Sequence, residues 1–506
     1  MKRASIISIC LLWSLAGFGQ ESLSVAGVFS SGAVLQCEKP VPVWGTCDPD
    51  SRVRIFLDET LVSEGRSDNT GNWMITLPAR EASFATREVM IVSEPDTIVL
   101  EDILFGEVWL ASGQSNMEYP MGKASGGDDF LENENEYIRV LRVPHRRGLL
   151  LETGFEKDDL KWERMQPEFS AVALYVAADL QENLDRPVGI IQSAWGGTNC
   201  ETWTPLPEMK EDPQLAPRVE KLMEAKYEKK AEEFEQEVRN YDAWVYETSR
   251  RKSAGEPPSD TPKPALSQYN PQSKNAPSSL YRNMILPFQP FSIRGVLWYQ
   301  GESNAYMHSE YFPLFQALVN GWRKGFQQDD LPFLFVQLPS YSKDFRDMRL
   351  VQARLRDSID NVEMVCAIDC GEEFNGHPKD KSQIGGRLAL LSLKYVYGKN
   401  LEARSPLPKQ AFLLNKKEII VQYDYAGEGL RAEGEEIPGF EVAGKNMEFV
   451  PARATLFSDN EILLESKIKK PLQIRYAYVN WPDPPLTLYN SAGLPAEPFV
   501  IPVVDQ

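Results

Sequence analysis

The chain has 506 residues, which is too long for one ordinary domain and predicts two or three. Hydrophobic residues make up 42% of it and charged residues 25%, the balance of a folded soluble protein. The formal net charge of −19 and the lack of any Lys/Arg-rich run argue against a nucleic-acid binder, which normally has a basic face. An anionic substrate would have to meet a local cationic group, because the overall charge would not attract it.

The first residues have the pattern of a secretory signal peptide. Lys2 and Arg3 precede a short apolar run, residues 6–16, and small residues follow it. The run is too short to span a bilayer, and no other apolar run is long enough. We therefore predict that residues 1–19 are a signal peptide and that the protein is secreted or periplasmic, with no membrane span.

Five cysteines follow the predicted signal peptide, an odd number, so at least one is free or pairs between chains. Cys37 and Cys47 lie in one β-rich segment and could pair. Cys366 and Cys370 have no neighbouring His or further Cys to complete a zinc site. We predict no metal and no cofactor.

The segment 24–104 is predicted to be an N-terminal β-sandwich domain. Short strands are expected at Val53–Leu57 and Trp73–Leu77, with turn residues between them at Asp68–Asn72. Several such strands at close spacing are typical of a small sandwich.

The segment 105–404 alternates apolar strands with helices, which predicts a parallel sheet covered on both faces. Such a doubly wound α/β domain binds its ligands at the carboxyl ends of the strands. The expected strands are Val108–Ala111, Val188–Gln192, Gly295–Tyr299, Phe333–Gln337 and Met364–Ile368, and the expected helices are Ala171–Leu184, Tyr311–Gly325, Met348–Ile359 and Gln383–Val396.

Residues 207–277 are predicted to interrupt this domain. A charged stretch with apolar residues at helical spacing indicates a solvated helical insertion, and a loop rich in Pro and Ser returns the chain to the sheet. Residues 405–506 are again β-rich, with strands expected at Glu418–Tyr423 and Leu472–Tyr478.

The sharpest motif is Gly-Glu-Val-Trp-Leu-Ala-Ser-Gly-Gln-Ser-Asn-Met at residues 106–117. An apolar strand runs into a tight turn that can present Ser115 at the strand's carboxyl end. A serine hydroxyl is a poor nucleophile until a base takes its proton. Taken alone, the motif is weak, because a serine in a helix-capping turn would look the same.

The chain has three histidines, and their settings differ. His145 lies beside two arginines, a poor setting for a base, and His308 lies at the start of a helix, where a surface role is expected. His377 follows the last apolar strand and precedes an apolar helix, so it should lie at the same end of the sheet as Ser115. We predict that His377 is the base.

Acyl transfer also needs donors aimed at the developing oxyanion. Two further strand ends offer them: Gly196 and Gly197 allow close approach of a backbone N–H, and Gln300 offers a side-chain amide. The alternatives are a plain turn for the glycines and a buried amide satisfying the backbone for Gln300. Asn116 and Glu302, from the same turns, are predicted to bind substrate.

Ser115, Gly196-Gly197, Gln300 and His377 occur in the order of the four sequence blocks of SGNH hydrolases, and the chain resembles the sialate O-acetylesterase family in particular. The matching stretches are VLQ with PVWG, then GEVWLASGQSNM, GGTNCETW, GVLWYQGESNA, LPFLFVQLP, HPKDK with GGRLAL, and LYNSAGLPAEPF. The resemblance implies an SGNH-type, flavodoxin-like sheet, a Ser115 nucleophile and a His377 base. It also implies an oxyanion hole made by the Ser115 N–H, a glycine of the Gly196-Gly197 pair and the Gln300 amide.

One departure from the family's pattern concerns the acid that orients the histidine. Simple SGNH enzymes carry Asp three residues before the histidine, where this chain has Phe374, and Asn375 stands where relatives often have Asp. Glu372 is the candidate acid. A backbone carbonyl could instead orient His377 and leave a Ser–His dyad, without the carboxylate that stabilises the imidazolium.

The expected substrate is an O-acetylated sugar, and the resemblance points first to an O-acetylated sialic acid. A sister interpretation is an acetylxylan or other polysaccharide acetylesterase, since fold does not fix substrate. The rival class is a non-catalytic carbohydrate-binding protein with a relict site. No nucleic-acid partner is expected.

Overall fold

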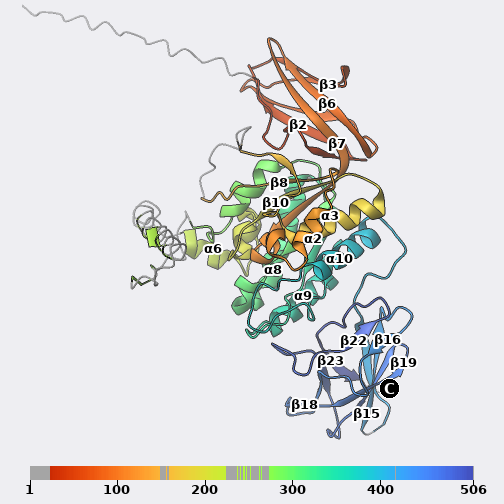
Figure 1. The fold of residues 1–506 in the computed structure, drawn as a ribbon. Helices are drawn as coiled ribbons and strands as arrows, with labels where there is room; N and C mark the ends of the chain where they lie inside the picture. The colour runs from red at the N-terminus through yellow and green to blue at the C-terminus, as the bar shows by residue number, and fades with distance from the viewer. Residues whose placement is uncertain are drawn as a thin grey trace, which may run out of the picture.

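The structure, a computed structural model, describes residues 23–148, 159–223 and 273–504 apart from residue 416, with isolated residues between these ranges. Figure 1 shows an elongated molecule in which a β-rich N-terminal region, a central α/β region and a β-rich C-terminal region follow one another. The predicted signal peptide and most of the predicted helical insertion lie outside the described residues. The domain boundaries remain predictions.

The N-terminal region consists of short antiparallel strands with one buried face. Strand β3 (Arg52–Leu57) pairs with β4 and β6, and β6 pairs with the first part of β7 (Asp96–Gly113). Alternate residues of β3 and β5 are buried, as expected for sheets with one face on a core. The remaining strands are β1 (Val34–Gln36), β2 (Val41–Thr46), β4 (Thr60–Arg66), β5 (Asn72–Leu77) and β6 (Ser83–Ser93).

Strand β7 then continues into the central sheet, whose strand order is β13-β12-β11-β7-β10-β8-β9. All neighbouring strands in it are parallel except β8 and β9. The order differs from the flavodoxin-like order, because β7, the first strand, lies between β10 and β11 instead of beside β8. The strands are β8 (Ile138–Arg142), β9 (Trp162–Arg164), β10 (Val188–Ala194), β11 (Gly295–Tyr299), β12 (Phe333–Val336) and β13 (Val362–Val365).

Helices cover both faces of this sheet, so its strands are apolar throughout. Trp109 and Ala111 of β7 belong to a core that includes residues of α3 (Ala171–Leu184) and α10 (Ser382–Leu391). Val108 and Leu110 belong to a second core with residues of α8 (His308–Phe326) and α9 (Arg346–Ser358). The further helices are α1 (Ser115–Glu118), α2 (Gly127–Glu132), α4 (Cys200–Trp203), α5 (Leu206–Glu211) and α6 (Ala216–Met223).

The predicted mixed α/β fold with a parallel sheet and a β-rich C-terminal region is confirmed. The predicted strand 364–368 ends earlier, at Val365, because Cys366 and Ile368 leave the sheet and pack into the core of the C-terminal region. The apolar run in the sequence is longer than the strand because its last residues pack against another region, which the sequence pattern does not show.

The C-terminal region is built on a sheet of order β18-β17-β21-β23-β14-β15-β20-β19, with a separate pair β16-β22. Arg349 of α9 fastens this region to the central one, since its buried guanidinium donates to the carbonyls of Val479 and Asn480. The strands are β14 (Leu407–Leu413), β15 (Glu418–Asp424), β16 (Leu430–Ala432), β17 (Phe440–Ala443), β18 (Phe449–Pro451), β19 (Arg453–Ser458), β20 (Glu461–Glu465), β21 (Gln473–Tyr476), β22 (Leu488–Asn490) and β23 (Phe499–Val504).

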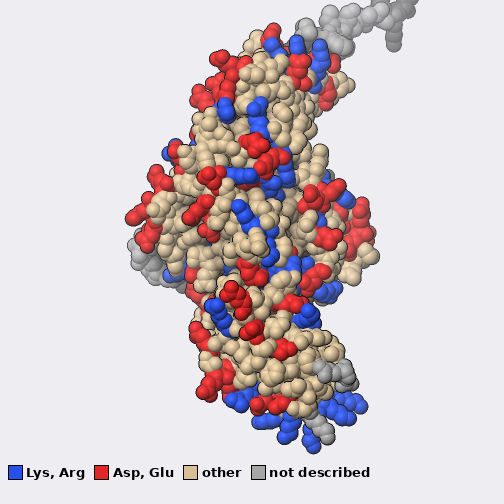
Figure 2. Space-filling view, turned by 90° about the vertical axis from the view of Figure 1, so that its right-hand side faces the viewer, with Lys and Arg blue, Asp and Glu red and all other residues tan. Residues whose placement is uncertain are grey.

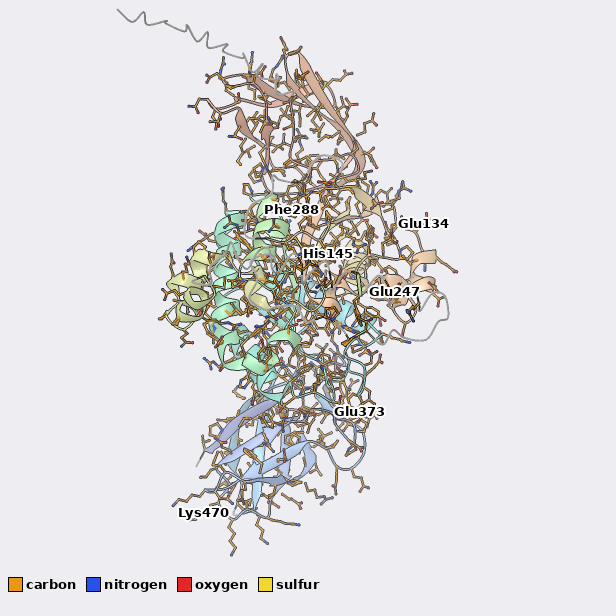
Figure 3. The ribbon with its side chains drawn as sticks, turned by 90° about the vertical axis from the view of Figure 1, so that its left-hand side faces the viewer. Glu134, His145, Glu247, Phe288, Glu373 and Lys470 are labelled. Atoms are coloured by element: carbon orange, nitrogen blue, oxygen red, sulfur yellow. The ribbon has the colours of Figure 1, made fainter. Side chains whose placement is uncertain are left out.

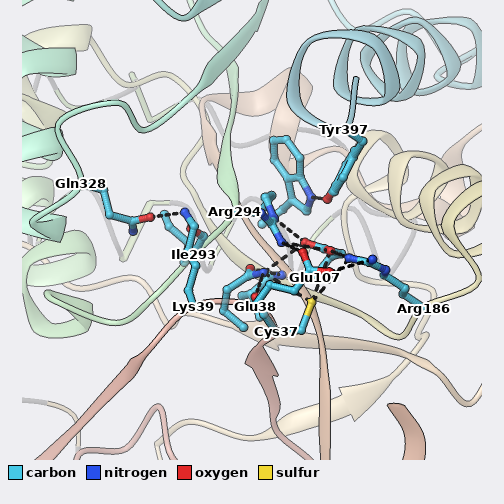
Figure 4. A network of polar contacts seen from close by, with 12 residues as sticks. Cys37, Glu38, Lys39, Glu107, Arg186, Ile293, Arg294, Gln328 and Tyr397 are labelled. Carbon is cyan, nitrogen blue, oxygen red and sulfur yellow. Dashed lines mark hydrogen bonds and ion pairs between the residues drawn. The ribbon is translucent and has the colours of Figure 1, made fainter. Parts of the chain in front are cut away.

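A buried ionic cluster joins the N-terminal region to the central sheet (Figure 4). The Glu107 carboxylate accepts hydrogen bonds from Arg186 and Arg294 at 2.8 and 2.6 Å, from Gln36 at 3.1 Å and from the Cys37 thiol at 3.3 Å. Cys37 and Cys47 are free thiols, so the pairing that the sequence allowed does not occur.

The charge distribution is uneven along the molecule. Figure 2 shows Lys and Arg side chains gathered at the far end of the C-terminal region, where Figure 3 places Lys470, although the chain as a whole is acidic. No described helix has the length and apolar content that a membrane crossing requires.

Candidate active site

Ser115 lies at the carboxyl end of β7, in the centre of the parallel sheet. The strand ends at Gly113, and Ser115 opens the four-residue helix α1. Gly113 is required there, because its φ is +134° and a Cβ would lie 2.2 Å from the carbonyl oxygen of Tyr299. The local sequence thus turns sharply and presents the serine hydroxyl at the strand end, as predicted.

The structure brings Ser115 and His377 together from positions 262 residues apart. His377 Nε2 lies 2.8 Å from Ser115 Oγ, a hydrogen-bonding distance. Burial, and then the charge of Lys381, lower the pKa of His377 below its ordinary value of 6.5. A histidine that stays neutral at pH 7 can accept the serine proton.

Glu372, the candidate acid, does not contact the His377 ring. Its two oxygens accept from the Asn375 side chain at 2.9 Å and from the Lys379 N–H at 2.7 Å. Asp369, the other nearby acid, makes a two-bonded ion pair with Arg387. Within the described part of the chain, the ring of His377 has no hydrogen-bond partner other than Ser115.

The Asn375 side chain holds His377 through the backbone of His377. Its Oδ1 accepts from the His377 N–H at 3.1 Å, and its Nδ2 donates to the His377 carbonyl at 2.9 Å. Asn375, which stands where relatives often have Asp, therefore bonds to the main chain of His377 and not to its ring. This geometry favours the dyad that the sequence left open as an alternative.

The predicted oxyanion donors differ in their availability. Gly196 packs against Ser115, but its N–H donates to Glu118 Oε2 at 2.6 Å. Both amide hydrogens of Gln300 are used, in donations to the Thr198 carbonyl at 3.1 Å and to Asn304 Oδ1 at 2.7 Å. Gln300 is completely buried and occupies the supporting role that was the alternative for it, so it could reach an oxyanion only by giving up one of these bonds.

The backbone N–H groups of Ser115 and Gly197 lie at this edge and have no hydrogen-bond acceptor among the described residues. Ser115 is the first residue of its helix, where an N–H has no partner within the helix. Gly197 has a φ of +69°, a conformation that suits glycine.

The pair predicted to bind substrate, Asn116 and Glu302, is joined by a hydrogen bond inside the protein. Asn116 is 1% exposed, and its Nδ2 donates to Glu302 Oε1 at 2.6 Å. Lys381, buried behind the site, donates to Asn116 Oδ1 at 2.7 Å. Asn116 and Glu302 thus lie behind the Ser–His pair, because both ends of the Asn116 amide are held by protein groups.

Sequence reasoning missed a cluster beside Gly196. The His145 ring stacks on Trp195 with ring centroids 4.1 Å apart, and its Nε2 lies 2.9 Å from Glu118. Lys274 donates to the Gly196 carbonyl at 2.5 Å. His145 lies in the middle of the α/β region and Glu373 towards the C-terminal region (Figure 3). Glu118 directly follows the motif at residues 106–117 and lies three residues after Ser115, which was the one sequence signal for this cluster.

The charge of Glu118 is stabilised by its surroundings. Burial raises its pKa, but the hydrogen bond and charge of His145, the Gly196 N–H and the charge of Arg142 outweigh burial, so the pKa is below its ordinary value. Arg142 and Arg147, which lie near this cluster, have no ion-pair partner among the described residues.

Comparison with known proteins supports a carbohydrate esterase. The family model described as "Carbohydrate esterase, sialic acid-specific acetylesterase" matches residues 264–393. The sialate O-acetylesterase of Mus musculus is 27% identical over 90% of each chain, and that of Homo sapiens is 28% identical over 98% of this chain and 95% of its own. The crystal structure of a carbohydrate acetylesterase from Xanthomonas citri has a TM-score of 0.77 and 27% identity, and the match covers 94% of this chain and 99% of that one. These matches confirm the resemblance to the sialate O-acetylesterase family.

Proposed function

Since the chain is a carbohydrate O-acetylesterase, we propose that it removes O-acetyl groups from sialic acids through an acetyl-enzyme on Ser115. The observation that carries the proposed mechanism is the 2.8 Å contact between Ser115 Oγ and His377 Nε2 at the carboxyl edge of the sheet. Ligands of α/β proteins bind at this edge.

In the first half of the reaction, Ser115 Oγ attacks the acetyl carbonyl carbon while His377 Nε2 takes the serine proton. The tetrahedral intermediate breaks down as the bond to the sugar oxygen cleaves, and His377 returns the proton to that oxygen. The second half repeats these steps with water as nucleophile, which releases acetate and restores the serine.

The negative oxygen of the intermediate needs donors on the side facing Ser115. The backbone N–H groups of Ser115 and Gly197 are proposed for this role, since both are uncommitted. The Gly196 N–H would join them only if Glu118 released it. Gln300 would support these turns from behind, through its bond to the Thr198 carbonyl.

The cations near Gly196 favour a sugar carboxylate over a neutral polysaccharide. Lys274 is bonded to the Gly196 carbonyl, and the charge of Arg147 contributes to lowering the Lys274 pKa, after burial. The charge of Arg142 contributes to lowering the pKa of Glu118. The acidic chain therefore has a local cationic group beside the nucleophile, which an anionic substrate requires.

The test is acetate release from O-acetylated sialic acids, acetylated xylan and a neutral aryl acetate. We expect turnover on the sialic acids, and loss of all three activities in Ser115→Ala. Arg147→Ala should raise KM for the sialic acids and leave KM for the neutral aryl acetate unchanged. Activity on xylan alone would favour the polysaccharide esterase. No activity, together with failure of a fluorophosphonate probe to label Ser115, would favour a sugar-binding protein with a relict site.

A further inference from the structure

One side chain ties the turn that carries the nucleophile to the turn that carries the base. Asn116 directly follows Ser115, and its Nδ2 donates to the carbonyl of Gly376 at 3.0 Å. Gly376 directly precedes His377. A single amide therefore spans the backbone positions next to the two reacting side chains, although these positions are 260 residues apart in the chain.

The amide can do this in one orientation only, and two buried charged groups select it. Lys381 Nζ donates to Asn116 Oδ1 at 2.7 Å, and Glu302 Oε1 accepts from Asn116 Nδ2 at 2.6 Å. An ammonium group offers donors alone and an ionised carboxylate offers acceptors alone, so a flipped amide would face both with the wrong atom.

Burial shifts the pKa values of Lys381 and Glu302 in opposite directions, and in each case it disfavours the charged form. Burial lowers the pKa of Lys381 to about 8, against the opposing charge of Glu302. Burial raises the pKa of Glu302, and the bond from Asn116 and the charge of Lys381 offset it only in part. Glu302 Oε2 is buried without a hydrogen-bond partner in the described part of the chain. Such costly placement is unusual unless a function needs it.

The other charged or titratable groups around the Lys381 ammonium come from several elements. The rings of Tyr119 and Tyr299 lie 5.0 and 5.8 Å from it. The charges of Glu302, Cys370, Glu372 and Asp380 all act on it as well, each in the direction that favours its protonated form. His377 is acted on by burial first and then by the positive charge of Lys381.

We propose that Asn116 is a positioning residue for catalysis, which ties the base turn to the nucleophile turn, and that Lys381 and Glu302 are present to hold its amide in the productive orientation. This inference rests on the proposed Ser115–His377 mechanism. It explains how a histidine without an orienting carboxylate stays aligned: its main chain is fixed by Asn375 on one side and, through Gly376, by Asn116 on the other.

The first experiment measures kcat and KM in Asn116→Ala. Loss of alignment by about 1 Å costs roughly 100-fold in rate, so we expect kcat to fall by about that factor with KM within about 2-fold of the parent. Asn116→Asp keeps the shape but removes the donor to Gly376, and it should lose a similar amount. Unchanged kcat in a folded Asn116→Ala protein would overturn the inference.

The second experiment needs no turnover. The chain has only three histidines, so the His377 imidazole can be followed by NMR titration in protein labelled with 13C-histidine. Lys381→Met removes a positive charge that disfavours imidazolium, so the His377 midpoint should move to higher pH. Lys379→Met, an exposed lysine of the same loop, is the matched control and should leave it unchanged. An unmoved or lowered midpoint in Lys381→Met would contradict the inference.

The two proposals fail in distinguishable ways. If Ser115→Ala retains full acetate release, the proposed function is wrong. If Ser115→Ala is inactive while Asn116→Ala turns over normally and Lys381→Met leaves His377 unmoved, only the positioning inference is wrong.

Discussion

Two buried carboxylates lie at opposite ends of the central sheet, and their surroundings differ in kind. Glu107 lies where β7 pairs with the first residue of β10, at the amino end of the parallel strands. Two arginines and two further donors surround it, and although burial raises its pKa, these partners outweigh burial and keep it low. Glu302 follows the carboxyl end of β11, and its Oε2 has no hydrogen-bond partner among the residues that the structure describes. Burial raises its pKa.

The difference separates a structural cluster from a functional one. The group of Cys37, Glu38 and Glu107 has the spacing of a metal site, but Arg186 and Arg294 already neutralise its carboxylates. Such a saturated cluster fastens one region to another. The cluster at Glu302 has an unpaired oxygen among the described residues and contacts the turns of both proposed catalytic residues, Ser115 and His377, which is typical of active sites.

The largest effect is expected at the functional end. His377→Ala should lower kcat by about 10⁴-fold or more, because no other described group can take the Ser115 proton. The unfolding temperature should change little, since Ser115 is the one hydrogen-bond partner of the ring among the described residues. Steady-state kinetics and thermal unfolding on one preparation measure both, and turnover above a few per cent would refute the role.

A substitution at Glu107 should reduce stability more than it reduces kcat. Glu107→Gln removes the buried carboxylate that Arg186 and Arg294 share and leaves them only the more exposed Glu38 as a counter-charge. Breaking a buried pair costs about 3–5 kcal/mol. We expect the free energy of unfolding in denaturant to fall by about this amount while kcat of the folded protein stays near normal. A large loss of kcat without loss of stability would mean that the two clusters do not divide in this way.

A smaller effect is expected for the acids near the base. Glu372→Gln weakens the hold on Asn375 and Lys379 without removing a contact to the His377 ring, so kcat should fall by about 10-fold at most. Asp369→Asn, the comparison variant, should reduce stability through the lost charge on Arg387. Loss of kcat by about 10⁴-fold in Glu372→Gln would restore the carboxylate triad, because that is the effect of mispositioning the imidazole.

The smallest effect is the position of the acid limb of the pH–rate profile. The base must be neutral, and the pKa of His377 lies below 6.5, so kcat/KM should rise with pH and level off before it would for an unperturbed histidine. The low midpoint of this limb follows from the burial of His377 and then from the charge of Lys381. A midpoint at or above 6.5 would mean that these surroundings do not act on the free enzyme.

Much of the fold, and the proximity of Ser115 to His377, could be predicted from the sequence for physical reasons. Parallel strands bring their carboxyl ends to one edge, so Ser115, Gly196 and His377 could be placed together because each follows a predicted strand. Helix α3 was predicted at its observed bounds, because its apolar residues recur at helical spacing and Ser170 caps it.

Side-chain direction could not be predicted in this way. Nothing in the spacing shows that the Gln300 amide turns towards Thr198 or that Asn116 turns inward. Those directions depend on partners from distant elements, such as Lys381 for Asn116. The roles predicted for Gln300 and Asn116 remain predictions, but the directions of their side chains are set by these long-range contacts.

The most direct test of the central claim is to trap the acetyl-enzyme. Rapid mixing with an acetylated substrate, acid quench and peptide mass spectrometry should find a mass increase of one acetyl group on the peptide that contains Ser115 and on no other. The increase should be absent in Ser115→Ala and should disappear from the wild type once substrate is exhausted. Acetate release with no modified Ser115 peptide at any time point would contradict the account.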